Sequence, residues 1–306
     1  MIDIVSRRLW FFLLSALLII ICAVSLGVFG LKTGIDFASG SELTVQFNQP
    51  VSLKSTDIEK ELAKLGYTAN VEVDSEANYH IRTIQLNPQE KAKVKETLVT
   101  KFGELTEKSF ESVDPLIARE TTRAAVIAVA VASIGILLYM AFAFRKVPKP
   151  FHYGICAVIA LVHDVLIVLG VFSILGRLAG WEIDLALTTG ILTVIGYAVN
   201  DTIVVFDRIR ENQKRYVGTD FGLVINTSLT ATMSRSLVTG MGVFFVLVAL
   251  ILFVGPAIKN LAVVLMVGIL TGTYTSVFIA APMLYVWDKG DWGSLTVKRE
   301  MVKKPA

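Results

Sequence analysis

The stretch LALTTGILTVIGYAVNDTIVVFDRIR, residues 185–210, governs the interpretation of the whole chain, because an apolar run of this kind contains an acid. A bilayer crossing needs about 20 residues, so Asn200 and Asp201 fall inside a membrane-length segment. A carboxylate at the bilayer centre costs about 3 kcal/mol on insertion scales, so we expect Asp201 to face protein or water and to be functional. Small and polar residues also recur every three to four positions, and we expect this stripe to meet other helices: Thr189, Thr193, Gly196, Tyr197 and Asn200.

The composition of the chain indicates an integral membrane protein. Hydrophobic residues make up 54% of 306 positions and charged residues 18%, against about 45–50% and about 25% in soluble domains. The net charge of +3 gives no reason to expect nucleic acid as a partner. Cys22 and Cys156 both lie in apolar runs and indicate no disulfide framework.

Five further apolar runs accompany the opening stretch, so the sequence predicts six transmembrane helices. The six runs are residues 9–31, 124–144, 151–175, 185–210, 229–254 and 261–287, with a Gly255-Pro256 turn before the last. The first run is longer than the apolar part of a signal peptide, about 7–15 residues, and no small-x-small cleavage site follows it. We therefore interpret it as an anchor rather than as a cleaved signal.

Residues 32–122 form a polar segment with the pattern of a ferredoxin-like α+β domain. Alternating or β-rich runs predict strands at 41–47, 70–74, 79–85 and 105–113, with a turn through Asp74, Ser75 and Asn78. Helices are predicted at 56–65 and at 87–103, where Asn87 and Glu90 form a capping box. The order βαββαβ is the split βαβ pattern. The segment carries no metal, nucleophile or phosphate-loop signature, and His80 reads as a lone surface residue.

The positions of Lys and Arg predict the orientation of the six helices. Basic residues before residue 9, in the turn 145–150, in the polar connection 207–228 and in the tail 288–306 fall on one side, whereas the opposite short loops carry only Arg177 and Lys259. By the positive-inside rule both termini are then cytoplasmic. The expected organisation is a first helix within 1–31, an extracytoplasmic domain at 32–122, a five-helix bundle at 123–287 and a cytoplasmic tail.

Polar residues within the spans are candidates for moving an ion. Asp164 lies about 20 Å along the third span, near the middle of the bilayer, and His163 precedes it. Asp201 and Arg235 fall at similar depth on the fourth and fifth spans, and an ion pair would satisfy both groups. Two alternatives stay open at this point. Arg235 extends to the headgroups without a partner, and His163 only hydrogen-bonds neighbouring backbone.

Small residues on the sixth span indicate close helix packing. Gly268, Gly272, Ser276 and Ala280 recur every four residues, a small-xxx-small stripe that lets another backbone approach. Tyr274 beside this stripe is interpreted as a core residue.

Five runs together resemble the SecF family, the six-span accessory subunits of the bacterial Sec protein translocase and a branch of the RND superfamily. The runs are GIDF (34–37), ALVHDV (160–165), GYAVNDTIVVFDRIR (196–210), NTSL (226–229) and RSL (235–237). The resemblance covers essentially the whole chain. The transmembrane acid and arginine of the family fall on Asp201 and Arg235, with Asn200, Asp164 and His163 as further candidates for the ion route.

The resemblance implies a role in protein export at the bacterial cytoplasmic (inner) membrane. Such a subunit pairs with SecD, associates with the SecYEG channel, and uses a proton or sodium gradient to drive late steps of preprotein movement. It is not an enzyme, sits in membrane lipid, and has no cofactor beyond H⁺ or Na⁺ as coupling ion.

A hinge between the exported domain and the membrane is also implied, at Gly34, Asp36, Phe37, Gly40 and Pro115. Two residues there depart from the family pattern. Ser39 stands where a second Gly is common, and Asp114 replaces the Gly usual before the proline.

Two other functions compete with this interpretation. A self-contained RND exporter of small molecules would need two six-span halves in one chain, whereas this chain has one. An intramembrane aspartyl protease would use Asp164 and Asp201 as a dyad, but Asp201 lacks the Gly-x-Gly lead of such enzymes and Arg235 would oppose a shared proton.

Overall fold

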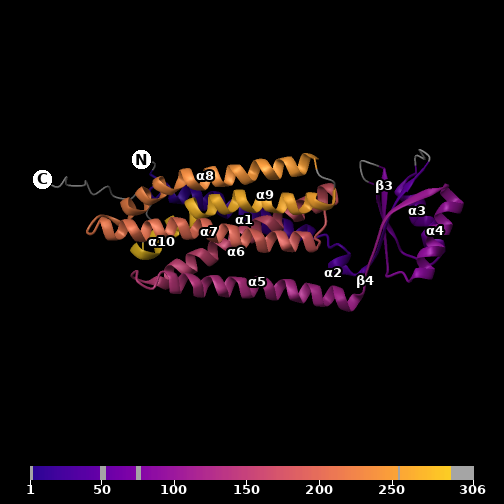
Figure 1. Ribbon diagram of the computed structural model, residues 1–306, viewed down its shortest axis with the longest axis horizontal. Helices are drawn as coiled ribbons and strands as arrows, with labels where there is room; N and C mark the ends of the chain where they lie inside the picture. The colour runs from indigo at the N-terminus through magenta and orange to yellow at the C-terminus, as the bar shows by residue number, and fades with distance from the viewer. Residues whose placement is uncertain (1–2, 49–52, 74–76, 254–255, 291–306) are drawn as a thin grey trace. The chain divides into compact units, whose positions relative to one another are not determined.

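The computed structural model describes residues 3–48, 53–73, 77–253 and 256–290, and the chain divides into two compact units. The helical unit comprises Met1–Lys32 and Ile127–Ala306, and the sheet unit comprises Thr33–Val126 (Figure 1). The predicted turn through Asp74 and Ser75, the residue Gly255 and most of the predicted tail lie outside the described residues.

Six of the described helical segments are long and apolar enough to span a bilayer, which confirms the predicted fold class. They are α1 (Arg8–Phe29), α5 (Pro115–Ala143), α6 (Pro150–Ala179), α7 (Leu185–Arg215), α8 (Phe221–Phe253) and a composite sixth segment. The sixth consists of α9 (Pro256–Thr275), the π-helix η1 (Ser276–Ala280) and α10 (Ala281–Lys289).

The π-helix interrupts a span that the sequence predicts as one regular helix. Pro282 is the second residue after it, and in an α-helix its ring would clash with the carbonyl of Phe278. The wider turn of a π-helix makes room for that ring, and such turns are frequent at functional sites.

Helix α7 is longer than the apolar run that predicts it, and α8 begins earlier. The predicted connection 207–228 is therefore mostly helical, and only residues 216–220 join the two helices. Glu211 explains the extension, because it accepts hydrogen bonds from Arg208 at 2.6 Å and Arg215 at 2.7 Å along the helix surface. Helix α5 also begins early, since Asp114 caps it by accepting a 2.8 Å bond from Leu116 N.

Helix α7 packs against α8 and α9, and α6 packs against α1 and α9 (Figure 1). The glycines of the sixth span allow this approach. A Cβ added at Gly268 would lie 2.2 Å from Val194 Cγ2, and one at Gly272 would lie 2.8 Å from Ala198 Cβ. Gly196 has no atom within 4 Å of such a Cβ, so it packs against no helix of this chain.

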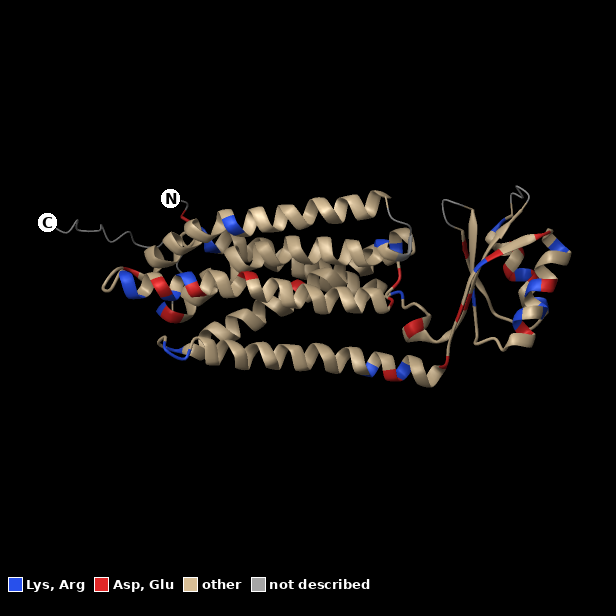
Figure 2. Cartoon of the chain, in the orientation of Figure 1, with Lys and Arg blue, Asp and Glu red and all other residues tan. Residues whose placement is uncertain are grey.

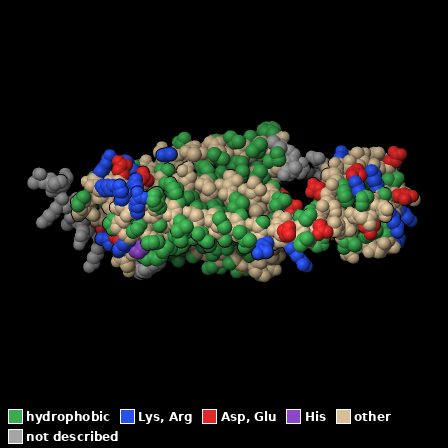
Figure 3. Space-filling view, turned by 60° about the horizontal axis from the view of Figure 1, so that its bottom comes forward, with side chains coloured by type: hydrophobic (Ala, Val, Ile, Leu, Met, Phe, Trp, Pro, Cys, Tyr) green, Lys and Arg blue, Asp and Glu red, His purple; other side chains and the backbone are tan. Residues whose placement is uncertain are grey.

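The surface of the helical unit is largely apolar. Hydrophobic side chains cover a broad band of it (Figure 3), including exposed side chains on α1 and α5 such as Trp10, Leu13, Leu138 and Phe142. Basic residues gather at the end where α5 meets α6 and α7 meets α8 (Figure 2). This distribution is that of a multi-pass membrane protein.

The sheet unit contains the predicted βαββαβ order and one short helix that the sequence analysis missed. Its elements are α2 (Ile35–Ala38), β1 (Gly40–Phe47), α3 (Ser55–Lys64), β2 (Asn70–Val73), β3 (Asn78–Thr83), α4 (Pro88–Phe102) and β4 (Leu105–Val113). The sheet order is β2-β3-β1-β4 and every pair is antiparallel, as in a ferredoxin-like fold. The capping box is present, with Glu90 N donating to Asn87 Oδ1 at 2.8 Å.

One face of this sheet carries the core of the unit. Alternation along β1 and β3 pairs Leu43 with Ile81 and Val45 with Tyr79, and these side chains are buried. Apolar residues of α3 and α4 pack onto them: Ile58, Leu62, Val94 and Leu98.

A charged cluster lies among the strand residues that alternate with this core. Glu42 Oε2 accepts from Arg82 Nε at 2.7 Å, and its other oxygen lies 3.1 Å from His80 Nδ1. His80, which the sequence analysis treats as alone, also lies 3.2 Å from Thr44 Oγ1. Burial raises the pKa of Glu42, but the hydrogen bonds from His80 and Arg82 and their charges outweigh it and hold that pKa below its usual value.

Candidate functional site

Asp201 lies on α7 where that helix faces α8, and it is half-buried. Its Oδ1 accepts a 2.6 Å hydrogen bond from Ser236 Oγ on α8. Its Oδ2 is buried and has no hydrogen-bond partner within the described part of the chain. A buried oxygen without a donor is costly, and it is a natural place for a proton, a cation or a water molecule.

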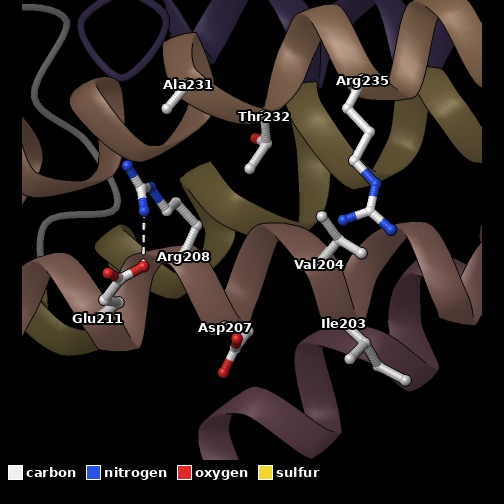
Figure 4. Close-up of a pocket in the computed structure, with 8 residues that line it drawn as sticks. All are labelled: Ile203, Val204, Asp207, Arg208, Glu211, Ala231, Thr232 and Arg235. Carbon is white, nitrogen blue, oxygen red and sulfur yellow. Dashed lines mark hydrogen bonds and ion pairs between the residues drawn. The ribbon is translucent and has the colours of Figure 1, made fainter.

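Arg235 is close to this acid but does not pair with it. No ion pair joins the two described side chains, so the pairing alternative is not realised in this structure. Successive residues on a helix point about 100° apart, and Ser236 is the one that faces Asp201. Arg235 is exposed and extends from α8 across to Val204 on α7 (Figure 4), near enough for its charge to act on the carboxylate.

The guanidinium of Arg235 enters a pocket of about 340 Å³ between α7 and α8 (Figure 4). The pocket has apolar walls near Arg235 and charged groups at its other end. Its lining is Ile203, Val204, Asp207, Arg208, Glu211, Ala231, Thr232 and Arg235. Arg208 Nη1 donates to Glu211 at 2.6 Å, whereas Arg235, the other cation of the lining, forms no ion pair with a described residue.

Asp164 on α6 belongs to a different, closed cluster. It is 2% exposed, and its Oδ1 accepts a 2.6 Å bond from Thr275 Oγ1 on α9. His163 Nδ1 lies 3.3 Å from the same oxygen, and His163 Nε2 lies 3.1 Å from Ser15 Oγ on α1. The alternative that His163 bonds only backbone is therefore wrong.

Tyr274 extends the same cluster and is more than the plain core residue that the sequence suggests. Its hydroxyl donates to Phe11 O at 3.1 Å and accepts from Ser15 Oγ at 3.3 Å. Asp164 and Asp201 make no hydrogen bond to each other and have separate partners. The geometry does not form the dyad that an aspartyl protease needs.

Asn200 does not join either acid. It is exposed on the outer face of α7 together with Thr189, Thr193 and Gly196. The two threonine hydroxyls bond backbone carbonyls of their own helix, at 2.9 and 2.8 Å. Of the stripe predicted to meet other helices, Tyr197 does so, since it packs against the cluster of Leu247, Ala262 and Ile269. The other four residues are exposed, and no helix in the described part of the chain covers them.

The residues implied as a hinge lie at the start of the sheet unit. Gly34 precedes α2, which contains Asp36 and Phe37, and Pro115 is the first residue of α5. Gly40 has φ +120, and a Cβ there would lie 2.5 Å from Thr83 O, so glycine is required. Ser39 has φ 63, a region that favours glycine. The hinge role itself stays a prediction.

The hydroxyl residues beside the two acids were missed by the sequence analysis as functional groups. Thr275 contacts Asp164, Ser236 contacts Asp201, and Ser276, expected only to pack, lies 2.8 Å from Thr202 Oγ1. The sequence does contain a signal for these contacts. Thr202 directly follows Asp201, Ser236 directly follows Arg235, and Thr275 and Ser276 are hydroxyl residues within an apolar span.

The NTSL run also has a structural role. Asn226 Oδ1 accepts from the N–H groups of Ile4 and Val5, both at 3.0 Å. Ser228 accepts from Asn212 Nδ2 at 2.9 Å. The start of α8 is thereby tied to the segment before α1 and to α7. Arg8, one of the basic residues before residue 9 that predict the orientation, is buried.

Comparison with known families agrees with this architecture. The model described as "Protein export membrane protein SecD/SecF, C-terminal" matches residues 93–290, and the "SecD/SecF GG Motif" matches residues 24–51. The second match includes the Ser39-Gly40 position described above.

Similar proteins and structures carry matching names. The chain is 46% identical over 305 residues to the protein translocase subunit SecF of Thermobaculum terrenum, covering 95% of this chain and 96% of that one. It is 36% identical to the protein translocase subunit SecDF of Bacillus subtilis, covering 93% of this chain and 38% of the relative. The crystal structure of SecDF, a translocon-associated membrane protein from Thermus thermophilus, matches with a TM-score of 0.83 at 28% identity, over 94% of this chain and 39% of that one. The chain therefore belongs to the SecD/SecF family of protein export membrane proteins, on the SecF side of that family.

Proposed function

We propose that this protein couples an ion gradient, of H⁺ or Na⁺, to late steps of preprotein export, and that Asp201 is the group that takes up and releases the ion. Its partners in this proposal are SecD, the SecYEG channel and the unfolded preprotein. The protein acts as a transducer and not as an enzyme.

The observation that carries the proposal is the state of the Asp201 carboxylate. One oxygen is held by Ser236, and the other is buried with no hydrogen-bond donor among the described residues. Asp201 does not itself line the pocket that Arg235 enters, but Ile203 and Val204 of the same helix do. An ion that binds and leaves such an oxygen changes the local charge within the bundle. Moving one charge through the membrane potential is worth about 2.3 kcal/mol per 100 mV, enough to bias a two-state rearrangement.

The exposed stripe of α7 supports a second six-span half as partner. Asn200, Thr189 and Thr193 present polar groups on a membrane-length helix, where lipid is an unfavourable neighbour. SecDF relatives are longer chains of which this chain covers about two-fifths, which fits a SecD half seated on this stripe. In this arrangement Asn200 contributes to the interface and not to the ion site of this chain.

The distribution of basic residues supports an orientation in the bacterial cytoplasmic membrane. The end where α5 meets α6 and α7 meets α8 is the basic one (Figure 2). By the positive-inside rule this end faces the cytoplasm, with both termini, and the sheet unit is extracytoplasmic.

The test is the substitution Asp201→Asn in vesicles that contain this chain with SecD and SecYEG. Export is measured as protease-protected preprotein while pH and sodium gradients are imposed separately. We expect the variant to lose the gradient-stimulated part of export while it still assembles with SecD, and the gradient that stimulates the wild type identifies the ion.

The matched control is Asp288→Asn, which removes an exposed carboxylate of the same unit that lies 3.1 Å from Lys149. It should export like the wild type. Undiminished gradient-stimulated export by Asp201→Asn would overturn the proposal.

A further inference from the structure

Asp164 and Asp201, the two acids within the spans that the proposal concerns, lie at the ends of a row of buried hydroxyl groups that is linked partly by hydrogen bonds and partly by adjacency along the chain. Thr275 contacts Asp164, and the next residue along the chain, Ser276, contacts Thr202 on α7. Thr202 immediately precedes Ile203 and immediately follows Asp201. All three hydroxyl residues are nearly inaccessible, with Thr275 at 0%, Ser276 at 1% and Thr202 at 3% exposure.

The hydroxyls of Thr275 and Ser276 each have one proton and more than one neighbour that can take it. Thr275 Oγ1 lies 2.6 Å from Asp164 Oδ1, 2.8 Å from Thr271 O and 3.1 Å from His163 Nδ1. Ser276 Oγ lies 2.8 Å from Gly272 O and 2.8 Å from Thr202 Oγ1. A hydroxyl donates one strong bond at a time, so a change in one acceptor redistributes its bond to the other.

The backbone at this point is able to respond. The π-helix η1 begins at Ser276, and hydroxyls that bond the carbonyl four residues earlier bend helices. Thr275 and Ser276 bond the carbonyls of Thr271 and Gly272, one turn before η1 begins. A change in the strength of the hydrogen bond between Thr275 and Asp164 therefore alters the backbone of the segment that positions Ser276 against α7.

The titratable and charged groups around this row lie on α1, α6, α7, α8 and α9. Asp164 faces His163 on its own helix, Thr275 on α9 and, through Ser15 of α1, Tyr274. Asp201 is influenced by Arg235 of α8 and lies near Tyr197 on its own helix.

We propose that Thr275 and Ser276 are positioning residues that couple Asp164 to Asp201, so that the charge of the closed acid sets the ion affinity of the accessible one. When Asp164 is a carboxylate, it holds the Thr275 proton; when Asp164 carries its own proton, Thr275 donates to Thr271 O instead. This exchange of hydrogen bonds displaces the backbone at the start of η1 and moves Ser276 relative to Thr202. Because Thr202 follows Asp201 on α7, the position and the ion affinity of the Asp201 carboxylate change with it. This role rests on the proposed function of Asp201.

The test measures the proton affinity of Asp201 and does not use export. Full-length chain assembled with SecD in lipid vesicles is titrated with acid while its carboxyl infrared bands are recorded. The Asp201 band is isolated by subtracting the spectrum of Asp201→Asn. We expect Asp164→Asn to change the proton affinity of Asp201 by at least about threefold, the lower end of couplings within one hydrogen-bond network.

The diagnostic result is non-additivity. Thr275→Val removes the hydroxyl but keeps the shape, and Asp164→Asn should then have no further effect on Asp201 in that background. Ser276→Ala should remove the effect of Asp164→Asn as well. Thr275→Ser restores the hydroxyl and should restore the coupling.

Thr271→Val is the matched control, because Thr271 lies one turn earlier on α9 and its hydroxyl bonds only Val267 O, at 2.7 Å. It should leave the Asp201 titration unchanged. Additive effects of Asp164→Asn and Thr275→Val, or an Asp201 band that ignores Asp164→Asn, would overturn the coupling. Undiminished export by Asp201→Asn would instead remove the proposed function and leave this titration result standing.

Discussion

Asp164 and Asp201 are the same residue type in neighbouring membrane helices, yet their surroundings differ in every respect. Asp164 is closed off, with partners from α6 and α9 and a histidine that leads on to α1. Asp201 is half-buried, and its carboxylate has one hydrogen-bond partner among the described residues, with Oδ2 buried and without a donor. The difference separates an acid enclosed by a hydrogen-bonded cluster from three helices from an acid held by a single hydroxyl, and the proposed ion exchange uses the second kind.

The largest effect expected from this contrast is on folding. Asp164→Ala removes the buried carboxylate that Thr275 and His163 both contact, leaves a cavity, and should lower the free energy of unfolding by about 2–3 kcal/mol. Asp201→Ala loses a single bond and should cost below about 1 kcal/mol. The measurement is denaturant unfolding of the purified chain in detergent. Equal losses for both variants would erase the distinction between a structural and an exchangeable acid.

Two glycines test the same contrast between a packed and an unpacked position, because Gly272 lies beside Asp164 and Gly196 lies on the exposed face of α7. Gly272→Ala places a methyl 2.8 Å from Ala198 Cβ and 3.5 Å from Asp164 Oδ2, so α9 and α7 must separate. We expect a loss of about 1–2 kcal/mol in the same unfolding measurement. Gly196→Ala meets no atom within 4 Å and should change stability by less than about 0.5 kcal/mol. A neutral Gly272→Ala would mean that the closed cluster tolerates expansion.

Glu42 in the sheet unit is a partly buried acid outside the membrane-spanning helices, and its effect on stability can be compared with those of Asp164 and Asp201. The pKa of Glu42 is held below its usual value by its partners, despite burial, so its folded form binds a proton less readily than its unfolded form. Its contribution to stability is therefore complete above the unfolded pKa of about 4.3 and is lost as pH falls through the lower folded pKa.

The corresponding variant is Glu42→Gln, and the measurement is unfolding of the full chain followed by a probe in the sheet unit. It should lower stability at neutral pH by about 0.5–1 kcal/mol, the size of a partly exposed ion pair, and flatten the acid dependence. An unchanged acid dependence would assign that dependence to other carboxylates of the unit.

Much of this architecture is predictable because it depends on local pattern. Apolar length defines the six spans, and alternation with the Asn87 capping box defines the sheet unit. The place of Asp201 in an apolar helix is enough to single it out as a candidate, and its role stays a prediction. The ends of α7 and α8 were predicted less well, since surface ion pairs along Glu211 continue the helix beyond the apolar residues.

The side-chain partners of the acids depend on information that local pattern does not contain. Depth along a helix follows from residue number, but the rotation of α8 about its axis is set by packing, and this decides that Ser236 rather than Arg235 meets Asp201. Ser15 and Thr275 reach His163 from positions more than one hundred residues away in the chain. The π-helix has a local cause in Pro282, which was a signal present in the sequence.

The polar stripe of α7 has a consequence for the ratio of this protein to its partner subunit in a cell. Asn200, Thr189 and Thr193 are exposed, with no described helix of the chain over them, so a copy inserted alone would place the Asn200 amide against acyl chains. Such a copy has a higher free energy in the bilayer than one whose stripe packs against a second subunit. We expect that unmatched copies cluster with each other or are cleared, which would keep the two halves at equal stoichiometry without any dedicated regulator.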